Sequence, residues 1–190
     1  MGLRDRLRAW TRGPWVYPTS ALIGFLEASF VLVPMEPLLI PVMAGRRRGV
    51  WSIAALLVAG NLLAAALLYW LGALLAPATV EPLVAAIGAH EAYASALENI
   101  RQRGFLALLL VDLTPIPFQV AMAAAGAAQF AFPLFLVAVV VSRGVRYFAL
   151  AGLVLLIGRR AERWIDEHQL EIFIWSAIIF AVIAAAMIWL

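Results

Sequence analysis

Ionisable side chains stand inside long apolar stretches of this sequence, among them Glu27, Glu36, Asp112, Arg143 and Arg146. A charged group at the centre of a lipid bilayer costs about 2.5–3.5 kcal/mol on insertion scales. Arginine stays protonated, and its planar guanidinium matches phosphate or carboxylate, whereas a carboxyl group in a low-dielectric site can bind and release protons. Acids and arginines that share one membrane cavity would therefore suit the proton-coupled movement of an anionic headgroup.

The positions of these residues suggest separate roles. Arg143 lies eleven residues into its apolar stretch, about 16 Å deep, and Arg146 follows one turn later on the same helix face. We predict that these two arginines bind phosphate and that Glu36, Asp112 and Glu27 carry protons. Structural alternatives remain: the arginines could pair with the acids to hold the fold, Glu36 could satisfy free backbone donors at a hairpin tip, and Asp112 could cap a short helix.

Three uncharged polar residues could line the same cavity. Tyr147 is four residues from Arg143 and can share its face, while Gln119 and Asn61 stand in other apolar stretches. Side chains of this kind also serve as hydrogen-bonding links between membrane helices. We therefore treat all three as candidate cavity residues.

The composition identifies the solvent of these side chains as lipid. Of 190 residues, 65% are hydrophobic and 13% are charged, whereas a globular domain has about 45–50% apolar residues and roughly a quarter charged. The chain has no cysteine, and no zinc-protease, P-loop or serine–histidine motif lies in its apolar stretches. We therefore expect an integral membrane protein that is not an enzyme and has no cofactor, metal or nucleic-acid partner.

Five apolar stretches can be placed in a membrane. Those at 50–76, 132–158 and 170–190 are uninterrupted and long enough to span it as helices, which takes about 20 residues. Those at 19–45 and 105–127 are interrupted by prolines, which remove backbone donors and clash with the preceding turn. We predict that each interrupted stretch forms a re-entrant hairpin; a proline-kinked transmembrane helix is the alternative.

The interruptions fall near the middle of each stretch. The prolines concerned are Pro34, Pro37, Pro41, Pro115 and Pro117. In the second hairpin, residues 105–113 and 118–126 would give two arms of about 13 Å, enough to reach the midplane. Such backbone is tolerated in a bilayer only where protein or a water-filled cavity covers it.

The two halves of the chain resemble each other. Residues 33–45 and 114–126 both have proline second and glycine last, and the following spans repeat at nearly the same offset. If the N-terminus lies in the cytoplasm, arginines 46–48 and those at 159–163 also lie on the cytoplasmic side, as the positive-inside rule requires. The two repeats then have opposite orientations in the membrane, which makes them an inverted repeat. Only Arg101 and Arg103 fall on the opposite side, at the end of a polar stretch (80–103) that could lie on the membrane surface.

The predicted fold class is thus an all-α polytopic membrane protein with an inverted repeat of re-entrant hairpin plus transmembrane helix. We expect a basic interfacial arm at 1–18, a membrane core at 19–158, and a basic loop with an extra transmembrane helix at 159–190.

Several motifs resemble the DedA family, also called the VTT or SNARE-associated domain. The run EASFVLVPMEPLLIPVMAG is similar to its opening signature, matched here by Glu27, Phe30, Pro34, Glu36 and Gly45. The run GNLLAAALLYWLG resembles its glycine-rich helix, matched by Gly60, Tyr69 and Gly72. TPIPFQVAMAAAG and SRGVRYF resemble the second hairpin and helix of a divergent branch with a Gly-Arg-x-x-Arg-Tyr-Phe motif.

The resemblance implies opposed re-entrant hairpins, a multi-pass place in the bacterial inner membrane, and lipid transport as a flippase or scramblase. Its substrate would be an anionic phospholipid or a polyprenyl phosphate such as undecaprenyl phosphate, with protons as coupling partner. Better-known members carry arginines around the second hairpin's prolines, where this chain has Asp112 and Gln119. A proton-coupled small-solute or ion transporter and a membrane scaffold without transport are the alternatives, and the chain could form a homodimer.

Overall fold

Two long apolar helices form the frame of the molecule. The computed structural model describes residues 13–29, 36–75, 85, 88–110 and 116–156. Within this part, two helices are long and apolar enough to cross a membrane, Arg47–Leu74 and Phe132–Leu156. The first comprises η1 (Arg47–Gly49) and α4 (Val50–Leu74), and the second carries Arg143 and Arg146 and is called the arginine helix below. These helices coincide with the predicted spans 50–76 and 132–158 over residues 50–74 and 132–156.

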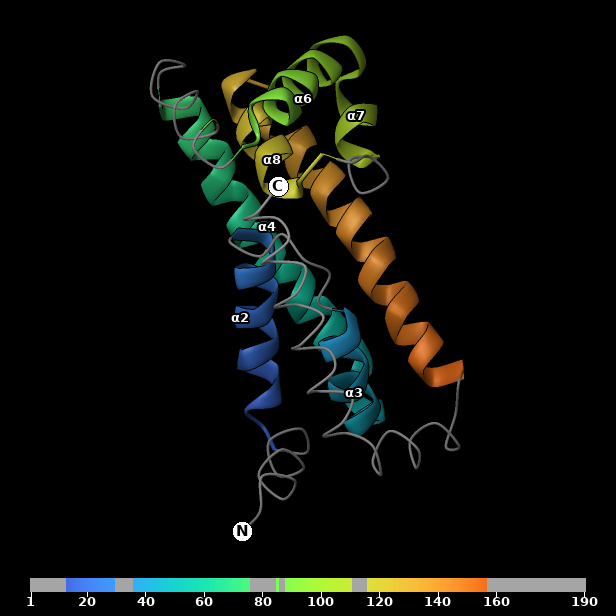
Figure 1. Cartoon of the computed structure of the whole chain (residues 1–190). Coiled ribbons are helices and arrows are strands. Elements are labelled where there is room, and N and C mark those ends of the chain that lie inside the picture. Colours follow the sequence, from blue (N-terminus) through green and yellow to red (C-terminus); the bar gives the residue numbers. More distant parts are fainter. Residues whose placement is uncertain (1–12, 30–35, 76–84, 86–87, 111–115, 157–190) are drawn as a thin grey trace.

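Shorter helices cover the two ends of this frame (Figure 1). At one end lie α2 (Val16–Ser29) and α3 (Glu36–Gly45), beside the start of α4. At the other end lie α6 (His90–Arg103), α7 (Phe105–Leu109) and α8 (Phe118–Ala127). The described residues are mostly helical and include no strand, so the predicted all-α class is confirmed at this level.

Each end has its own hydrophobic core. At the first end, α2 and α3 pack on the first half of α4 and the second half of the arginine helix, through residues such as Val16, Met43, Leu57 and Tyr147. At the other end, α6, α7 and α8 pack on the remaining halves of the same two helices, through residues that include Met122. Each long helix therefore packs at one end of the molecule through its first half and at the other end through its second half. An inverted repeat would produce this arrangement. The repeat itself and the re-entrant turns stay predictions, because residues 30–35 and 111–115 lie outside the described part.

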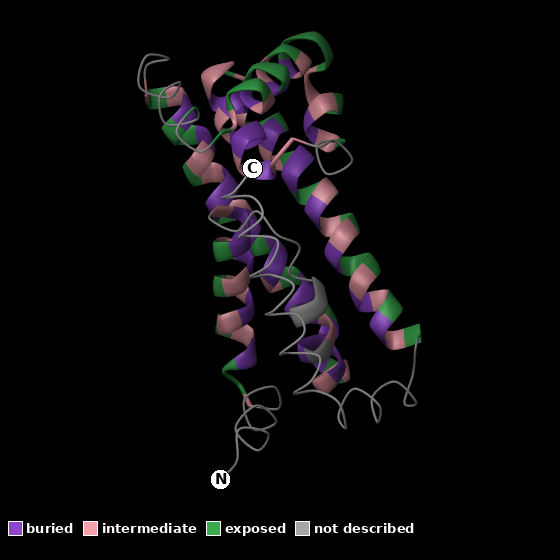
Figure 2. Cartoon of the chain, viewed as in Figure 1, coloured by how far each residue is buried: buried purple, intermediate pink, exposed green. Residues whose placement is uncertain are grey.

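The outer faces of the frame are apolar. Large hydrophobic side chains are exposed along both long helices, as Figure 2 shows for the helices as a whole. Val145 is 68% exposed and Leu63 is 66% exposed, and Trp51 and Trp70 stand half exposed near opposite ends of α4. An exposed apolar surface of this extent suits lipid rather than water, and half-exposed tryptophans suit the two membrane interfaces.

Glycines allow α2 to lie directly against α4. A Cβ atom on Gly24 would meet the backbone carbonyl of Leu57, and one on Gly60 would meet the carbonyl of Ala21. A matching pair, Gly72 and Gly126, lies where α4 crosses α8. Small residues at such crossings let membrane helices approach until their backbones touch. The close approach brings polar groups of α2 within reach of α4 in the middle of the frame.

Two arginines join three chain segments at the end that holds α2 and α3. Arg46 donates from Nε to Tyr17 Oη (3.1 Å) and from Nη1 to the Gly13 carbonyl (2.8 Å). Arg47 donates from Nη2 to the carbonyl of Leu155 (2.7 Å), near the last turn of the arginine helix. The start of α2, the turn before α4 and the end of the arginine helix therefore lie at one end, as the predicted topology requires.

Replacing Arg47 by glutamine should lower the stability of the protein by about 1–2 kcal/mol, because a charged donor is lost from the carbonyl groups that end a helix. Unfolding of the detergent-solubilised protein measures the effect. The neighbouring Arg48 is exposed, so Arg48→Gln is the matched control and should change stability by less than about 0.5 kcal/mol. Equal losses in both variants would contradict a specific role for Arg47.

Several predicted boundaries are wrong. Helix α3 begins at Glu36 and runs through Pro37 and Pro41, which were predicted to interrupt the chain. Proline is tolerated in a first helical turn, where its missing N–H has no partner anyway, and Pro41 removes one further bond from a packed helix. Helix α2 begins at Val16, inside the predicted arm at 1–18.

The second predicted hairpin also differs from the expectation. Its first arm was predicted at 105–113, but α7 has five residues, about 7.5 Å of helix. Helix α8 occupies the residues predicted for the second arm, 118–126, and its role as a hairpin arm stays a prediction. The predicted helix at 170–190 lies outside the described residues, and the division of the chain into arm, core and C-terminal segment stays a prediction.

Candidate functional site

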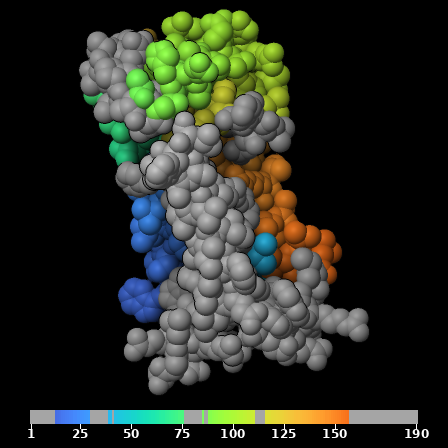
Figure 3. Space-filling view, in the orientation of Figure 1, coloured from blue at the N-terminus to red at the C-terminus, as the bar shows by residue number. Residues whose placement is uncertain are grey.

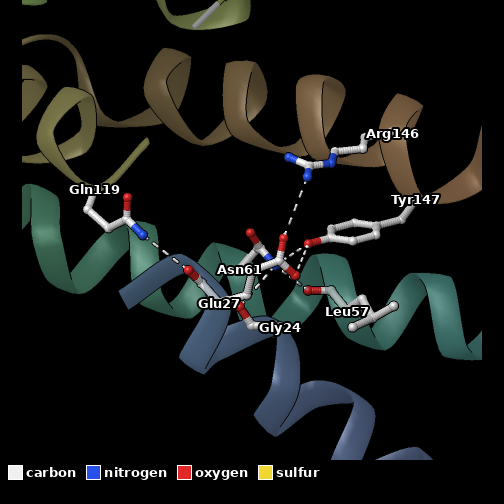
Figure 4. A network of polar contacts seen from close by, with 7 residues as sticks. All are labelled: Gly24, Glu27, Leu57, Asn61, Gln119, Arg146 and Tyr147. Atoms are coloured by element: carbon white, nitrogen blue, oxygen red, sulfur yellow. Dashed lines mark hydrogen bonds and ion pairs between the residues drawn. The ribbon is translucent and has the colours of Figure 1, made fainter. Parts of the chain in front are cut away.

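A buried carboxylate is the centre of a polar network between the long helices (Figure 4). Glu27, in the last turn of α2, is 6% exposed. Tyr147 donates its hydroxyl to Glu27 Oε2 over 2.8 Å. Arg146 Nη2 lies 3.9 Å from Glu27 Oε1. One carboxylate thus receives a hydrogen bond and a positive charge, both from the arginine helix.

Asn61 holds the tyrosine hydroxyl in place. It is fully buried on α4, and its Nδ2 donates to Tyr147 Oη over 3.0 Å. The same amide group donates to the carbonyls of Gly24 (2.9 Å) and Leu57 (3.1 Å). Because the Tyr147 oxygen accepts from Asn61, its single proton is directed to Glu27. The network therefore links α2, α4 and the arginine helix.

The start of α8 joins the same network. Gln119 donates from Nε2 to the backbone carbonyl of Glu27 over 3.1 Å. The last carbonyls of a helix have no partner inside it and must find one elsewhere. This bond therefore gives the Glu27 carbonyl, at the end of α2, a hydrogen-bond partner. It also connects α2 to α8, the helix that packs at the other end of the frame (Figure 4).

Arg143 is the most deeply buried charge of the described part. Its side chain is 4% exposed, and its guanidinium carbon lies 3.7 Å from the centre of the Phe118 ring, at the first residue of α8. A guanidinium over an aromatic face gains about 2 kcal/mol or more when both are removed from water. The start of α8 therefore positions Arg143 as well as Gln119.

The site lies at mid-depth. Arg143 is the twelfth of 25 residues in the arginine helix, and Asn61 is the twelfth of 25 residues in α4. At about 1.5 Å per residue, each is roughly 16 Å from the start of its helix, half of a hydrocarbon layer about 30 Å thick. Charges at this depth need partners, and the network supplies them.

The structure brings most of the candidate residues together. Glu27, Asn61, Gln119, Arg146 and Tyr147 are in direct contact through the bonds above, and Arg143 lies one helical turn from Arg146 on the same helix. Their predicted roles in transport stay predictions.

Two candidate acids cannot be placed beside them. The side chain of Glu36 and all of Asp112 lie outside the described residues. The N-cap residue of α8 is Pro117, and the alternative role of Asp112 as a helix cap falls outside the described residues and stays a prediction.

Sequence reasoning missed the residues that set the geometry. Phe118, on which Arg143 lies, and Gly24, whose carbonyl holds Asn61, were not candidates. The small residues Ser20, Gly24 and Ala28, spaced four apart and buried on α2, were a signal for a close helix crossing.

Two buried polar atoms near the network have no hydrogen bond within the described part of the chain, Asn61 Oδ1 and Ser29 Oγ. Buried polar atoms are nearly always paired, and such atoms are usual attachment points for internal water or a polar ligand. Within the described residues, no group of three or more histidine, cysteine, aspartate or glutamate side chains could hold a metal ion.

Replacing Tyr147 by phenylalanine should cost about 1–3 kcal/mol of stability, because a buried carboxylate oxygen and a buried amide lose one partner. A double-mutant cycle with Glu27→Gln, measured by unfolding in detergent, tests whether the two act as one unit. We expect a coupling energy of at least about 0.5 kcal/mol. Additive losses would show that the hydroxyl does not act through the carboxylate.

Comparison with known proteins places the chain in a family. A family described as the VTT domain matches residues 33–156. A curated protein of Haemophilus influenzae, named only as uncharacterized, is 27% identical over 180 residues, which cover 95% of this chain and 93% of that protein. No solved structure matches. The matched region includes both long helices and most of the polar network, and the chain belongs to the VTT domain family, which confirms its resemblance to DedA proteins.

Proposed function

We propose that this membrane protein moves an anionic lipid between the leaflets of the bacterial inner membrane, with its N-terminus in the cytoplasm. The lipid would be a phospholipid or a polyprenyl phosphate such as undecaprenyl phosphate. The observation that carries the proposal is a buried carboxylate beside Arg146, with the buried Arg143 one helical turn away over Phe118, where α2, α4, α8 and the arginine helix come together. Such a cluster is costly in a membrane unless it is used.

The geometry supports an exchange of partners at Arg146. The 3.9 Å separation between Arg146 and Glu27 is long for a charge-assisted hydrogen bond, so another anion could compete with Glu27 for this arginine. Protonation of Glu27 would remove its charge and release Arg146 for a phosphate. Arg143, one turn away, would supply a second guanidinium. Loss of the proton would restore the carboxylate and expel the phosphate, and Glu36 and Asp112 would relay protons.

A lipid fits this site better than a soluble ion because the site has an apolar side. Arg146 is 30% exposed, and the adjacent Val145 is exposed to the lipid face of the arginine helix. A headgroup could reach Arg146 from that face while its hydrocarbon chains stay in the bilayer. Lateral entry of this kind avoids moving the chains through a polar pore.

Reconstitution tests the proposal. The full-length protein would be placed in phosphatidylcholine vesicles that carry a fluorescent phosphatidylglycerol, and the quenching of inner-leaflet label by external dithionite would be followed. We expect wild-type protein to accelerate exchange. Arg146→Gln should slow exchange about tenfold, because it should remove roughly 1.4 kcal/mol of binding free energy between the protein and the moving headgroup. The exposed-site variant Arg48→Gln should match wild type. Exchange no faster than in protein-free vesicles would contradict the proposal.

A further inference from the structure

An apolar groove lies outside the central network, between α6, α7 and α8. Its cavity volume is about 180 Å³. Ile100, Leu108 and Ala121 form its deepest part and are all buried, and Asn99 and Arg103 lie on its α6 side. Helices α6 and α7 make up the surface of this end of the molecule (Figure 3). The groove therefore combines an apolar floor with a cationic and an amide group at one edge.

The turn between α6 and α7 shapes the groove. Gly104 has φ +53°, a left-handed backbone conformation that other residues rarely adopt, and its N–H bonds the carbonyl of Ile100 over 2.8 Å. Helix α6 thus ends at Arg103, and the chain turns at once into the apolar α7. This places the guanidinium-bearing end of α6 beside the apolar side chains of α7, which include Leu106 in the groove wall.

The polar side chains of the groove are arranged for an anion. Asn99 and Arg103 are one helical turn apart and share a face of α6, whereas Arg101 does not line the groove. The guanidinium of Arg103 makes no hydrogen bond or ion pair with another described residue. Helix α6, which ends at Arg103, lies at the opposite end of the molecule from α3 and the start of α4 (Figure 1). In the proposed orientation this is the outer side, where the positive-inside rule disfavours arginine.

We propose that this groove is a docking site for one anionic lipid, with the first carbons of a hydrocarbon chain on Leu108 and Ala121 and the phosphate at Arg103 and Asn99. This proposal rests on the proposed function, because the docked lipid is of the same class as the lipid that the protein would move between leaflets. Ala121 is two residues from Gln119, which bonds Glu27. A lipid in the groove therefore lies beside α8, the helix that reaches the central network. The groove would hold the lipid before its transfer to that network.

A photoreactive phosphatidylglycerol with a diazirine near the glycerol end of one acyl chain tests the site. Full-length protein in phosphatidylcholine vesicles that contain this probe would be irradiated, and the labelled peptides identified by mass spectrometry. We expect label on the α6–α7 segment. Labelling should fall about fivefold in Arg103→Gln, because one interfacial arginine changes the binding of an anionic lipid by about this factor. Arg101→Gln is the matched control and should keep wild-type labelling. Ala107→Trp, which fills the groove, should lower labelling while Arg103 remains.

Three results separate the possibilities. Equal labelling in Arg103→Gln and Arg101→Gln would overturn the site, as would labelling that Ala107→Trp leaves unchanged. Loss of label when soluble glycerol phosphate is added would show that the ligand is a free phosphate ester rather than a lipid, and would also overturn the proposal. Labelling requires no movement between leaflets. Vesicles that label at the groove yet show no exchange would therefore retain the docking site and contradict the proposed function alone.

Discussion

Replacing Glu27 by glutamine is expected to slow lipid exchange about a hundredfold and leave the fold in place. Glutamine has the shape of glutamate and can still accept the Tyr147 hydroxyl, so the helices stay together. It carries no charge, however, and cannot bind or release a proton. In the proposed cycle the returning carboxylate charge expels the phosphate from Arg146, so its loss should slow release; a hundredfold change in rate corresponds to about 2.7 kcal/mol.

The dithionite assay measures this effect at several pH values. Wild-type exchange should depend on pH, because the carboxylate must gain and lose a proton in each cycle, and Glu27→Gln exchange should be slow and independent of pH. Glu98→Gln changes an exposed glutamate of α6 in the same way and should behave as wild type. A Glu27→Gln protein with the rate and pH dependence of wild type would contradict the role of Glu27.

The Gly60→Ala protein should lose about 2–3 kcal/mol of stability, although alanine is the better helix former. The added Cβ would meet the backbone carbonyl of Ala21 and the backbone nitrogen of Phe25, and neither can move without shifting α2. Overpacking of this kind costs about 1–3 kcal/mol, and here it also separates Asn61 from the Gly24 carbonyl. Exchange activity should fall with stability.

Gly152 supplies the matched control. It lies in the arginine helix, and a Cβ there would meet nothing within 4 Å. Gly152→Ala should therefore raise stability by up to about 1 kcal/mol, the difference in helix propensity. Thermal unfolding of both variants in the same detergent makes the comparison. Stabilisation of both proteins by alanine would show that α2 and α4 do not cross closely at Gly60.

The sequence was sufficient to predict two helices that are long and apolar enough to cross a membrane and most of the polar residues that meet between them. Length and apolar composition identify 50–76 and 132–158 because a bilayer requires about 20 apolar residues of any helix that spans it. The cost of a buried charge predicts that Glu27 and Arg146 find partners, and they do. Neither argument depends on details of packing, which is why both succeed.

Other features depend on tertiary contacts that the sequence does not state. Pro37 and Pro41 were expected to break a helix, but α3 contains both because its apolar face is packed against α4 and the arginine helix. Nothing in the sequence indicated that the Tyr147 hydroxyl would join Asn61 to Glu27. That bridge exists because Gly24 and Gly60 let the backbones of α2 and α4 come into contact. Whether a glycine permits such a contact depends on the surface that packs against it, which the sequence does not state.

A photoreactive amino acid at position 119 tests most directly whether the central network receives a lipid. Gln119 would be replaced by benzoylphenylalanine, and Val145, on the lipid face of the arginine helix, would be replaced in a matched protein. Both proteins would be irradiated in vesicles of phosphatidylcholine with a minority of phosphatidylglycerol. We predict that position 119 captures phosphatidylglycerol well above its share of the bilayer, whereas position 145 captures the two lipids in proportion. Proportional capture at both positions, or none at 119 in a folded protein, would contradict a phosphate-binding site between α8 and the arginine helix.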